Sequence, residues 1–371
     1  MLFYLAIFSV VTTIVYVYQK SVAKPASKKW LWLLAIFLLV LVASLRVNVG
    51  TDYPNYVDLY YRISLGFKTH FEPGFVFINQ ISRVLFNSPQ GVFILSSALY
   101  VSCVFYAVKR QSKNLALSII LFCVLPFYLY SFNAVRQAVA LGMILVASWY
   151  IFRAKFWKYF LVVCVSAVLF HKTALLMVPM YFLLRFDYRK YGYLLVLIAA
   201  GIVTMCRRYL INVLLFFYPA YRNQLELLDE GVSEIFVGMG LFGLVLVIYL
   251  LSIKRLSMKK NEHRIYINTV FYVLTLHSLF FWMPGAFRLY SYLDILLIIV
   301  IPNLISLIED KDIKRFIIVL LNCMLFVYFI ISVGLNNSND VLPYKTIFND
   351  SIKSRDLILQ KRLEWGLSNE N

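Results

Sequence analysis

Apolar residues occur in long runs along this chain, and short polar stretches separate the runs. The runs lack the two-residue alternation of a β-barrel, and many approach the ~20 residues that a helix needs to cross a bilayer. The pattern therefore predicts a polytopic helical membrane protein. The expected spans are Leu2–Tyr18, Trp30–Leu45, Val92–Val108, Leu115–Tyr130, Ala138–Phe152, Tyr193–Tyr218, Ile235–Ile253, Tyr266–Met283, Leu289–Ile308 and Phe316–Leu335.

One apolar stretch, Phe160–Leu184, is interrupted at its centre by Phe170-His171-Lys172-Thr173-Ala174. Each half has only about 12 residues, which is short for a full crossing but suits a re-entrant pair. We expect about ten transmembrane helices plus this broken hairpin. Two thin full crossings, giving twelve helices, would leave the loops on the same sides.

Composition and charge agree with a membrane protein and suggest its orientation. The 371 residues are 62% hydrophobic and 15% charged, with a net charge of +18. Lys and Arg mark cytoplasmic loops, and no basic-aromatic patch or finger spacing indicates nucleic-acid binding. Both termini are then extracytoplasmic, provided that the hairpin returns. The basic loops lie at 19–30, 109–113, 153–158, 185–190, 254–264 and 311–315.

We expect a single integral membrane domain over residues 1–371. An extracytoplasmic loop at 46–90 and an extracytoplasmic tail at 336–371 extend from it. Within the loop, Phe75–Phe86 mixes apolar and polar residues and predicts an interfacial amphipathic helix. The first apolar run has Lys after it rather than before it, so we interpret it as a retained helix and not as a cleaved signal.

Arg136 is a charge between two apolar runs, where burial is costly and a guanidinium cannot lose its proton. Asn133, Arg136 and Gln137 follow helical i, i+3, i+4 spacing at the outer start of a span. A helix N-terminus and an arginine fork both suit phosphate or carboxylate. The alternative is an arginine that snorkels to lipid headgroups.

Other cations are predicted on the same outer side. Arg288 follows a tight outer turn and precedes an apolar helix, so that Arg136 and Arg288 could clamp a diphosphate. Arg207 and Arg208 lie within a long apolar run and are secondary candidates. The outer loop adds one cation and two carboxylates, which could equally form a local salt bridge: Arg46, Asp52 and Glu72.

His171, with Lys172 beside it, is the candidate proton acceptor, because imidazole titrates near neutral pH. The alternative is a hydrogen-bonded core histidine, and this is the interpretation we favour for His277 within its span. The five cysteines are widely spaced and match no metal or redox motif. A nucleotide-binding P-loop is also missing, so neither a metal nor a cofactor is expected.

Several short motifs, in order along nearly the whole chain, resemble the EpsG family of bacterial polysaccharide polymerases, which are related in function to Wzy O-antigen polymerases. The motifs are Leu45-Arg46…Gly50-Thr51-Asp52-Tyr53…Tyr56, Glu72-Pro73-Gly74-Phe75, Phe132-Asn133-Ala134-Val135-Arg136-Gln137…Ala140, Phe170-His171-Lys172-Thr173-Ala174, Arg288-Leu289-Tyr290 and Pro343-Tyr344-Lys345.

The resemblance implies a Wzy-like, GT-C-like bundle in the bacterial cytoplasmic membrane. Such a protein transfers a growing glycan from undecaprenyl diphosphate to a new lipid-linked repeat unit, and works beside a flippase and a chain-length regulator. Arg136, Arg288, Arg46, Asn133 and Gln137 would bind the diphosphate. His171, Asp52 or Glu72 would accept the proton, and Tyr53, Lys172 and Tyr344 are secondary candidates. The alternatives are a glycan ligase of the same fold and a transporter or flippase.

Overall fold

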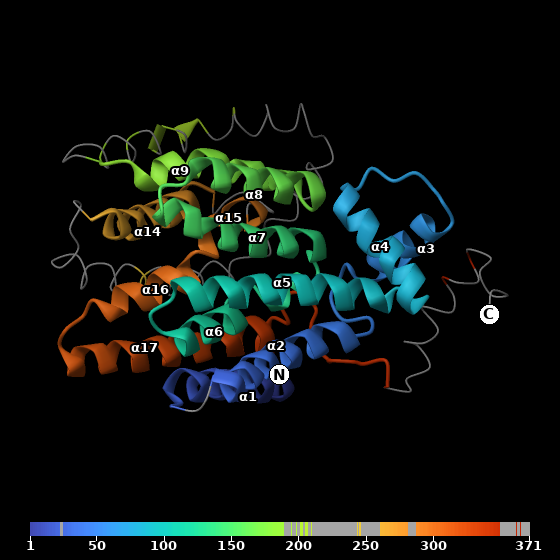
Figure 1. Cartoon of the computed structure of the whole chain (residues 1–371), viewed down its shortest axis with the longest axis horizontal. Helices are drawn as coiled ribbons and strands as arrows, with labels where there is room; N and C mark the ends of the chain where they lie inside the picture. The colour runs from blue at the N-terminus through green and yellow to red at the C-terminus, as the bar shows by residue number, and fades with distance from the viewer. Residues whose placement is uncertain are drawn as a thin grey trace.

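The computed structural model describes residues 1–22, 25–188, 260–280 and 287–348, with scattered residues between 194 and 245 and at 361 and 364. Its described part is built from helices, and Arg46 and Thr346 form an isolated antiparallel β-bridge. Figure 1 shows the long helices side by side along the longest dimension of the molecule. The all-α polytopic architecture expected from the apolar runs is thereby confirmed.

Within the described residues, six helical segments are long and apolar enough to cross a membrane. They correspond to predicted spans at both ends and in the middle of the chain. These segments are α1 (Leu2–Lys20), α2 (Pro25–Leu45), α5 (Gln90–Gln111), α7 (Val135–Phe152), the pair α15 (Phe287–Asp294) and α16 (Leu297–Ser306), and α17 (Lys311–Phe329) with the π-helical turn η5 (Ile330–Leu335).

Two expected spans differ in extent. The predicted helix Leu115–Tyr130 is shorter, because α6 (Leu115–Val124) stops before Leu125-Pro126 and a residue that precedes proline avoids helical angles. Its remainder is a bend and the 3₁₀ turn η1 (Leu129–Phe132). The span near Tyr266–Met283 is represented by α14 (Asn261–Phe280). The two predicted spans within 193–253 lie almost wholly outside the described residues.

The interrupted apolar stretch folds as a hairpin. It comprises α8 (Phe156–Leu169), the 3₁₀ turn η2 (Lys172–Leu176) and α9 (Met177–Arg185). The Tyr159 hydroxyl donates to the Met177 carbonyl at 2.6 Å, and Arg185 Nη1 donates to the Ile151 carbonyl at 2.6 Å. Because these contacts return the chain to the end of α7, the hairpin turns back as the sequence predicts.

Helices α5 and α7 lie at the centre of the bundle. Helix α2 packs against α5, helix α8 packs against α7, and α1 contacts both α2 and α6. The loop between α2 and α5 contributes two further helices, α3 (Tyr53–Ser64) and α4 (Pro73–Phe86), which stand at one end of the bundle in Figure 1. The end of the bundle that carries α3 and α4 also receives the start of α7.

Helix α4 is amphipathic, as expected for an interfacial helix. Phe75 and Ile78 are buried against the protein, whereas Phe77, Val84 and Leu85 are exposed. The helix ends at Asn87, whose φ of 44° is the left-handed conformation common at helix C-termini. An exposed apolar stripe beside a polar loop suits the surface of a bilayer.

The chain after η5 returns across the same end of the bundle. Within this return segment, residues 336–348, the carbonyls of Lys345 and Asp340 accept from the amides of Val47 and Gly50 at 3.0 and 2.8 Å. The Tyr344 hydroxyl donates to the Val42 carbonyl at 2.9 Å. The return segment therefore fixes the end of α2 and the first part of the loop that follows it.

Candidate active site

Three residues expected at the outer face come together between α4, α7 and the hairpin tip. The Arg136 guanidinium donates to Glu72 Oε2, and His171 Nδ1 lies 3.8 Å from Glu72 Oε1. The Glu72 side chain is only 7% exposed, whereas those of Arg136 and His171 are each 22% exposed. The cluster is thus shielded from bulk solvent but open at its edge.

The position of Glu72 follows from the start of α4. Pro73 occupies the first helical turn, where a missing amide hydrogen costs nothing. Gly74 then lies against α8, since a Cβ at this position would stand 2.6 Å from the Leu169 carbonyl oxygen. Glycine therefore permits the close approach that brings Glu72 beside His171.

The turn before α7 is held from three sides. Asn133 Nδ2 donates to the Asn339 carbonyl at 3.0 Å, and the Val135 amide donates to the Tyr56 hydroxyl at 3.1 Å. Gly50 has a φ of +94°, and a Cβ there would lie 2.5 Å from Asn133 Oδ1. Because α7 begins at Val135, Asn133 precedes the helix and supports the turn instead of sharing a helical face with Arg136.

Gln137 connects this turn to the second candidate cation. Its Nε2 atom donates to the Arg288 carbonyl at 2.6 Å and to Ser291 Oγ at 3.2 Å. Gln137 is buried, so its contribution is to hold the first turn of α15 beside α7. The Arg288 side chain itself is exposed and hydrogen-bonds the Tyr130 hydroxyl.

Tyr130 is a member of the site that the sequence did not reveal. It lies in η1, at the end of an apolar run, where a tyrosine is indistinguishable by pattern from a core aromatic. Its only sequence signal is its place three residues before Asn133. Asp52, at the start of α3, lies near enough to Tyr130 and Tyr56 to interact electrostatically with both hydroxyls.

The electrostatics of the cluster determine the protonation of His171. Burial, followed by the positive charge of Arg136, lowers the pKa of His171 from 6.5 to about 4, although Glu72 opposes the shift. His171 is consequently neutral at pH 7 and able to accept a proton. Next to it, Lys172 is exposed, and Thr173 Oγ1 donates to the Tyr292 hydroxyl at 3.2 Å.

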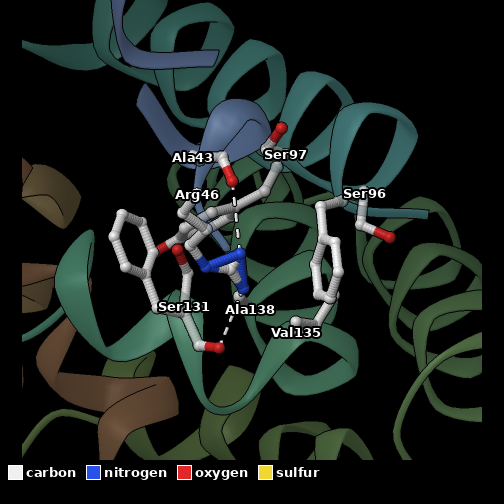
Figure 2. A pocket seen from close by; sticks show the side chains of 10 residues that line it. Ala43, Arg46, Ser96, Ser97, Ser131, Val135 and Ala138 are labelled. Atoms are coloured by element: carbon white, nitrogen blue, oxygen red, sulfur yellow. Dashed lines mark hydrogen bonds between the residues drawn. The ribbon is translucent and has the colours of Figure 1, made fainter. Parts of the chain in front are cut away.

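Arg46 does not join the cluster, although its charge and loop position suggested a diphosphate contact. It is 2% exposed, and its Nη1 and Nη2 atoms donate to the carbonyls of Ala43 and Phe132 at 3.2 and 2.9 Å. This guanidinium lines a small cavity of about 10 Å³. Figure 2 shows it between aromatic rings. The rings of Phe93 and Phe132 lie 4.4 and 4.5 Å from its central carbon. Arg46 therefore has a structural role, because it supports the turn before α7 from within the protein core.

Two of the secondary candidates also have structural contacts. Tyr53 is buried, and its hydroxyl donates to Gln90 Oε1 at 3.1 Å, while Tyr344 anchors the return segment to α2. Arg207 and Arg208 lie outside the described residues. Within the described part of the chain, no three His, Cys, Asp or Glu residues are grouped so as to hold a metal ion.

The helical bundle, with a charged cluster at one end, defines a polytopic membrane protein. The EpsG family model matches residues 29–346, most of the chain, and the chain belongs to the EpsG family. This family is associated with polysaccharide polymerisation. The match includes Glu72, Arg136, His171 and Arg288. No curated protein and no solved structure matches the chain.

Proposed function

We propose that this protein polymerises undecaprenyl-diphosphate-linked repeat units at the outer face of the bacterial cytoplasmic membrane. The observation that carries the proposal is the convergence of Arg136, Glu72 and His171 beside the turn that bears Arg288. In the reaction, the bond between the donor's anomeric carbon and its diphosphate oxygen breaks. The acceptor hydroxyl forms the new glycosidic bond, and undecaprenyl diphosphate leaves.

The two arginines are suited to stabilise the leaving group. Arg288 is exposed and reaches the Tyr130 hydroxyl, so it is accessible to a lipid headgroup at the membrane surface. Arg136 is held by Glu72, and its buried Nε atom has no hydrogen-bond partner among the residues that the structure describes. Fixed donors that face a developing negative charge lower the barrier without reorganising during the reaction.

His171 is the proposed general base, and Glu72 is its positioning residue. The imidazole is neutral at pH 7, and its Nδ1 atom faces Glu72. At 3.8 Å the carboxylate is beyond hydrogen-bond distance, so it acts through its charge and stabilises the imidazolium that forms on proton transfer. The second nitrogen, Nε2, then takes the proton of the acceptor hydroxyl. Asp52 remains an alternative base, at the start of α3.

The test compares Arg136→Lys and Arg136→Ala with Arg153→Ala, which removes an arginine just beyond the opposite end of α7. We expect both Arg136 variants to reduce polymerisation, by roughly 10²–10³-fold for alanine, because an oriented charge contact is lost and lysine lacks the bidentate fork. Polymer length in cells and transfer of lipid-linked repeat units in membranes are measured at equal protein level. Normal polymer in Arg136→Ala cells refutes the assignment.

The products also distinguish the alternative functions. Loss of a polymerase leaves single repeat units on the final acceptor, because these units are still exported. Loss of a ligase leaves long chains on the lipid, and loss of a flippase leaves no glycan outside the membrane. The accumulated product in a deletion strain, with complementation by wild type, therefore decides among the three.

A further inference from the structure

Phe71 is an exposed aromatic residue directly beside the catalytic cluster. It precedes Glu72 in the chain, and its ring centroid lies 4.5 Å from the central guanidinium carbon of Arg136. Although the ring contacts this cation, the residue remains 38% exposed. A phenyl ring that is fixed by a cation and also accessible to solvent differs from the buried aromatic residues of the bundle.

This position suits contact with a sugar. The face of an aromatic ring carries negative partial charge, whereas the C–H bonds on one face of a pyranose carry positive partial charge. A pyranose stacked on Phe71 would place its hydroxyls next to the residue that follows in the chain, Glu72, and hence near His171. The same ring contacts Arg136, which sets its orientation through a cation–π interaction.

We propose that Phe71 is the platform for the acceptor sugar, the pyranose whose hydroxyl attacks the donor. The inference rests on the proposed function and adds a residue that determines how the acceptor binds. Phe71 then has two contacts: Arg136 orients the ring, and the acceptor stacks on it. When the acceptor pyranose stacks on Phe71, one of its hydroxyls points toward Glu72. This is the hydroxyl that reaches His171.

The experiment uses Phe71→Leu and Phe71→Trp in the full-length protein, purified in nanodiscs. Leucine keeps apolar cover over Arg136 and Glu72 but removes the aromatic face, whereas tryptophan keeps an aromatic face. Phe77→Leu is the matched control, since Phe77 is an exposed phenylalanine on α4. The probe is the repeat-unit oligosaccharide released from the host polymer, which carries no lipid diphosphate and therefore acts only as an acceptor.

Binding of this oligosaccharide is measured by saturation-transfer NMR, and its KM as acceptor is measured at a fixed concentration of lipid-linked donor. We expect Phe71→Leu to weaken binding and raise the acceptor KM by roughly 3- to 10-fold with little change in kcat. Phe71→Trp and Phe77→Leu should bind like wild type. A thermal unfolding curve for each variant verifies that it is folded.

The inference is overturned if Phe71→Leu binds the oligosaccharide as wild type does, because Phe71 would then only shield the ion pair. It is also overturned if wild type does not bind the probe, or if tryptophan fails as leucine does. Binding is measured without glycosyl transfer. A protein that binds the glycan through Phe71 but transfers nothing would contradict the proposed polymerase reaction and leave the sugar platform supported.

Discussion

Replacing Glu72 by glutamine tests the central pairing of the site, because the side chain keeps its shape and loses only its charge. Glu72 contacts both Arg136 and His171, so one substitution affects the cation and the base together. Of the groups that shift the pKa of His171, Glu72 raises it, whereas burial, Arg136 and Arg288 lower it. Without the carboxylate, His171 remains neutral but becomes a weaker base.

The magnitude follows from the separation of the two groups. Unit charges about 4 Å apart attract by about 4 kcal/mol at an effective dielectric constant near 20, and His171 Nδ1 lies 3.8 Å from Glu72 Oε1. The positive charge of Arg136 compensates part of this attraction. We therefore expect the imidazolium formed during transfer to lose about 3 kcal/mol of stabilisation, a rate reduction of about 10²-fold.

The assay is single-turnover transfer between lipid-linked repeat units with enzyme in excess, so that product release does not limit the rate. Glu309→Gln, at an exposed position after α16, is the control for loss of one carboxylate. If Glu72→Gln transfers glycan within twofold of wild type at equal protein level, Glu72 does not assist His171. The assignment of the base would then be wrong.

Four further predictions concern the base and its supports. The base acts when it is deprotonated, so the transfer rate should persist from pH 8 to pH 5 and fall as the pH drops through about 4, the pKa of His171. A pH–rate profile in which activity is lost near pH 6.5 would contradict the burial of His171. Stability should also depend on pH, because the unfolded imidazole binds a proton below about pH 6.5 whereas the folded one binds it only near pH 4. The thermal midpoint should therefore fall as the pH is lowered from about 6.5 to about 4. Gly74→Ala should reduce transfer more than tenfold in folded protein, because its Cβ meets the Leu169 carbonyl; wild-type rates would show that α4 can shift freely. Arg46→Lys should lower stability by about 1–3 kcal/mol, since the lysine ammonium lacks the planar fork that bonds the Ala43 and Phe132 carbonyls between aromatic rings, and an unchanged midpoint would refute this.

The sequence was sufficient to predict the helical class, and it predicted that Arg136, Glu72 and His171 share one face with Arg46, Asp52 and Arg288. These predictions depended on long-range rules, namely the length of apolar runs and the sidedness of basic loops. A charged residue within or between apolar runs is also a local signal, which can be recognised from the sequence alone. For this reason the hairpin break and the start of α7 could be identified before their contacts were known.

The contacts of buried polar residues could not be predicted in the same way. Arg46 has the pattern of a surface cation, and only the fold shows that its charge is enclosed. His277 has few polar neighbours in sequence, yet its Nε2 atom pairs with Asp294 Oδ2 at 2.8 Å, across two helices. Partners of this kind are brought together by packing, which a one-dimensional pattern does not record.

The return segment has a consequence for the order in which the protein becomes active during its synthesis. Asn339 and Asp340 bind Asn133 and Gly50, two residues that are each made more than two hundred positions earlier. The helices that carry Arg136 and His171 enter the membrane well before these partners leave the ribosome. An incompletely synthesised chain therefore has its charged residues in place but lacks two of the contacts that hold the turn before α7. The return segment, which is made after the helices that carry Arg136 and His171, supplies these contacts.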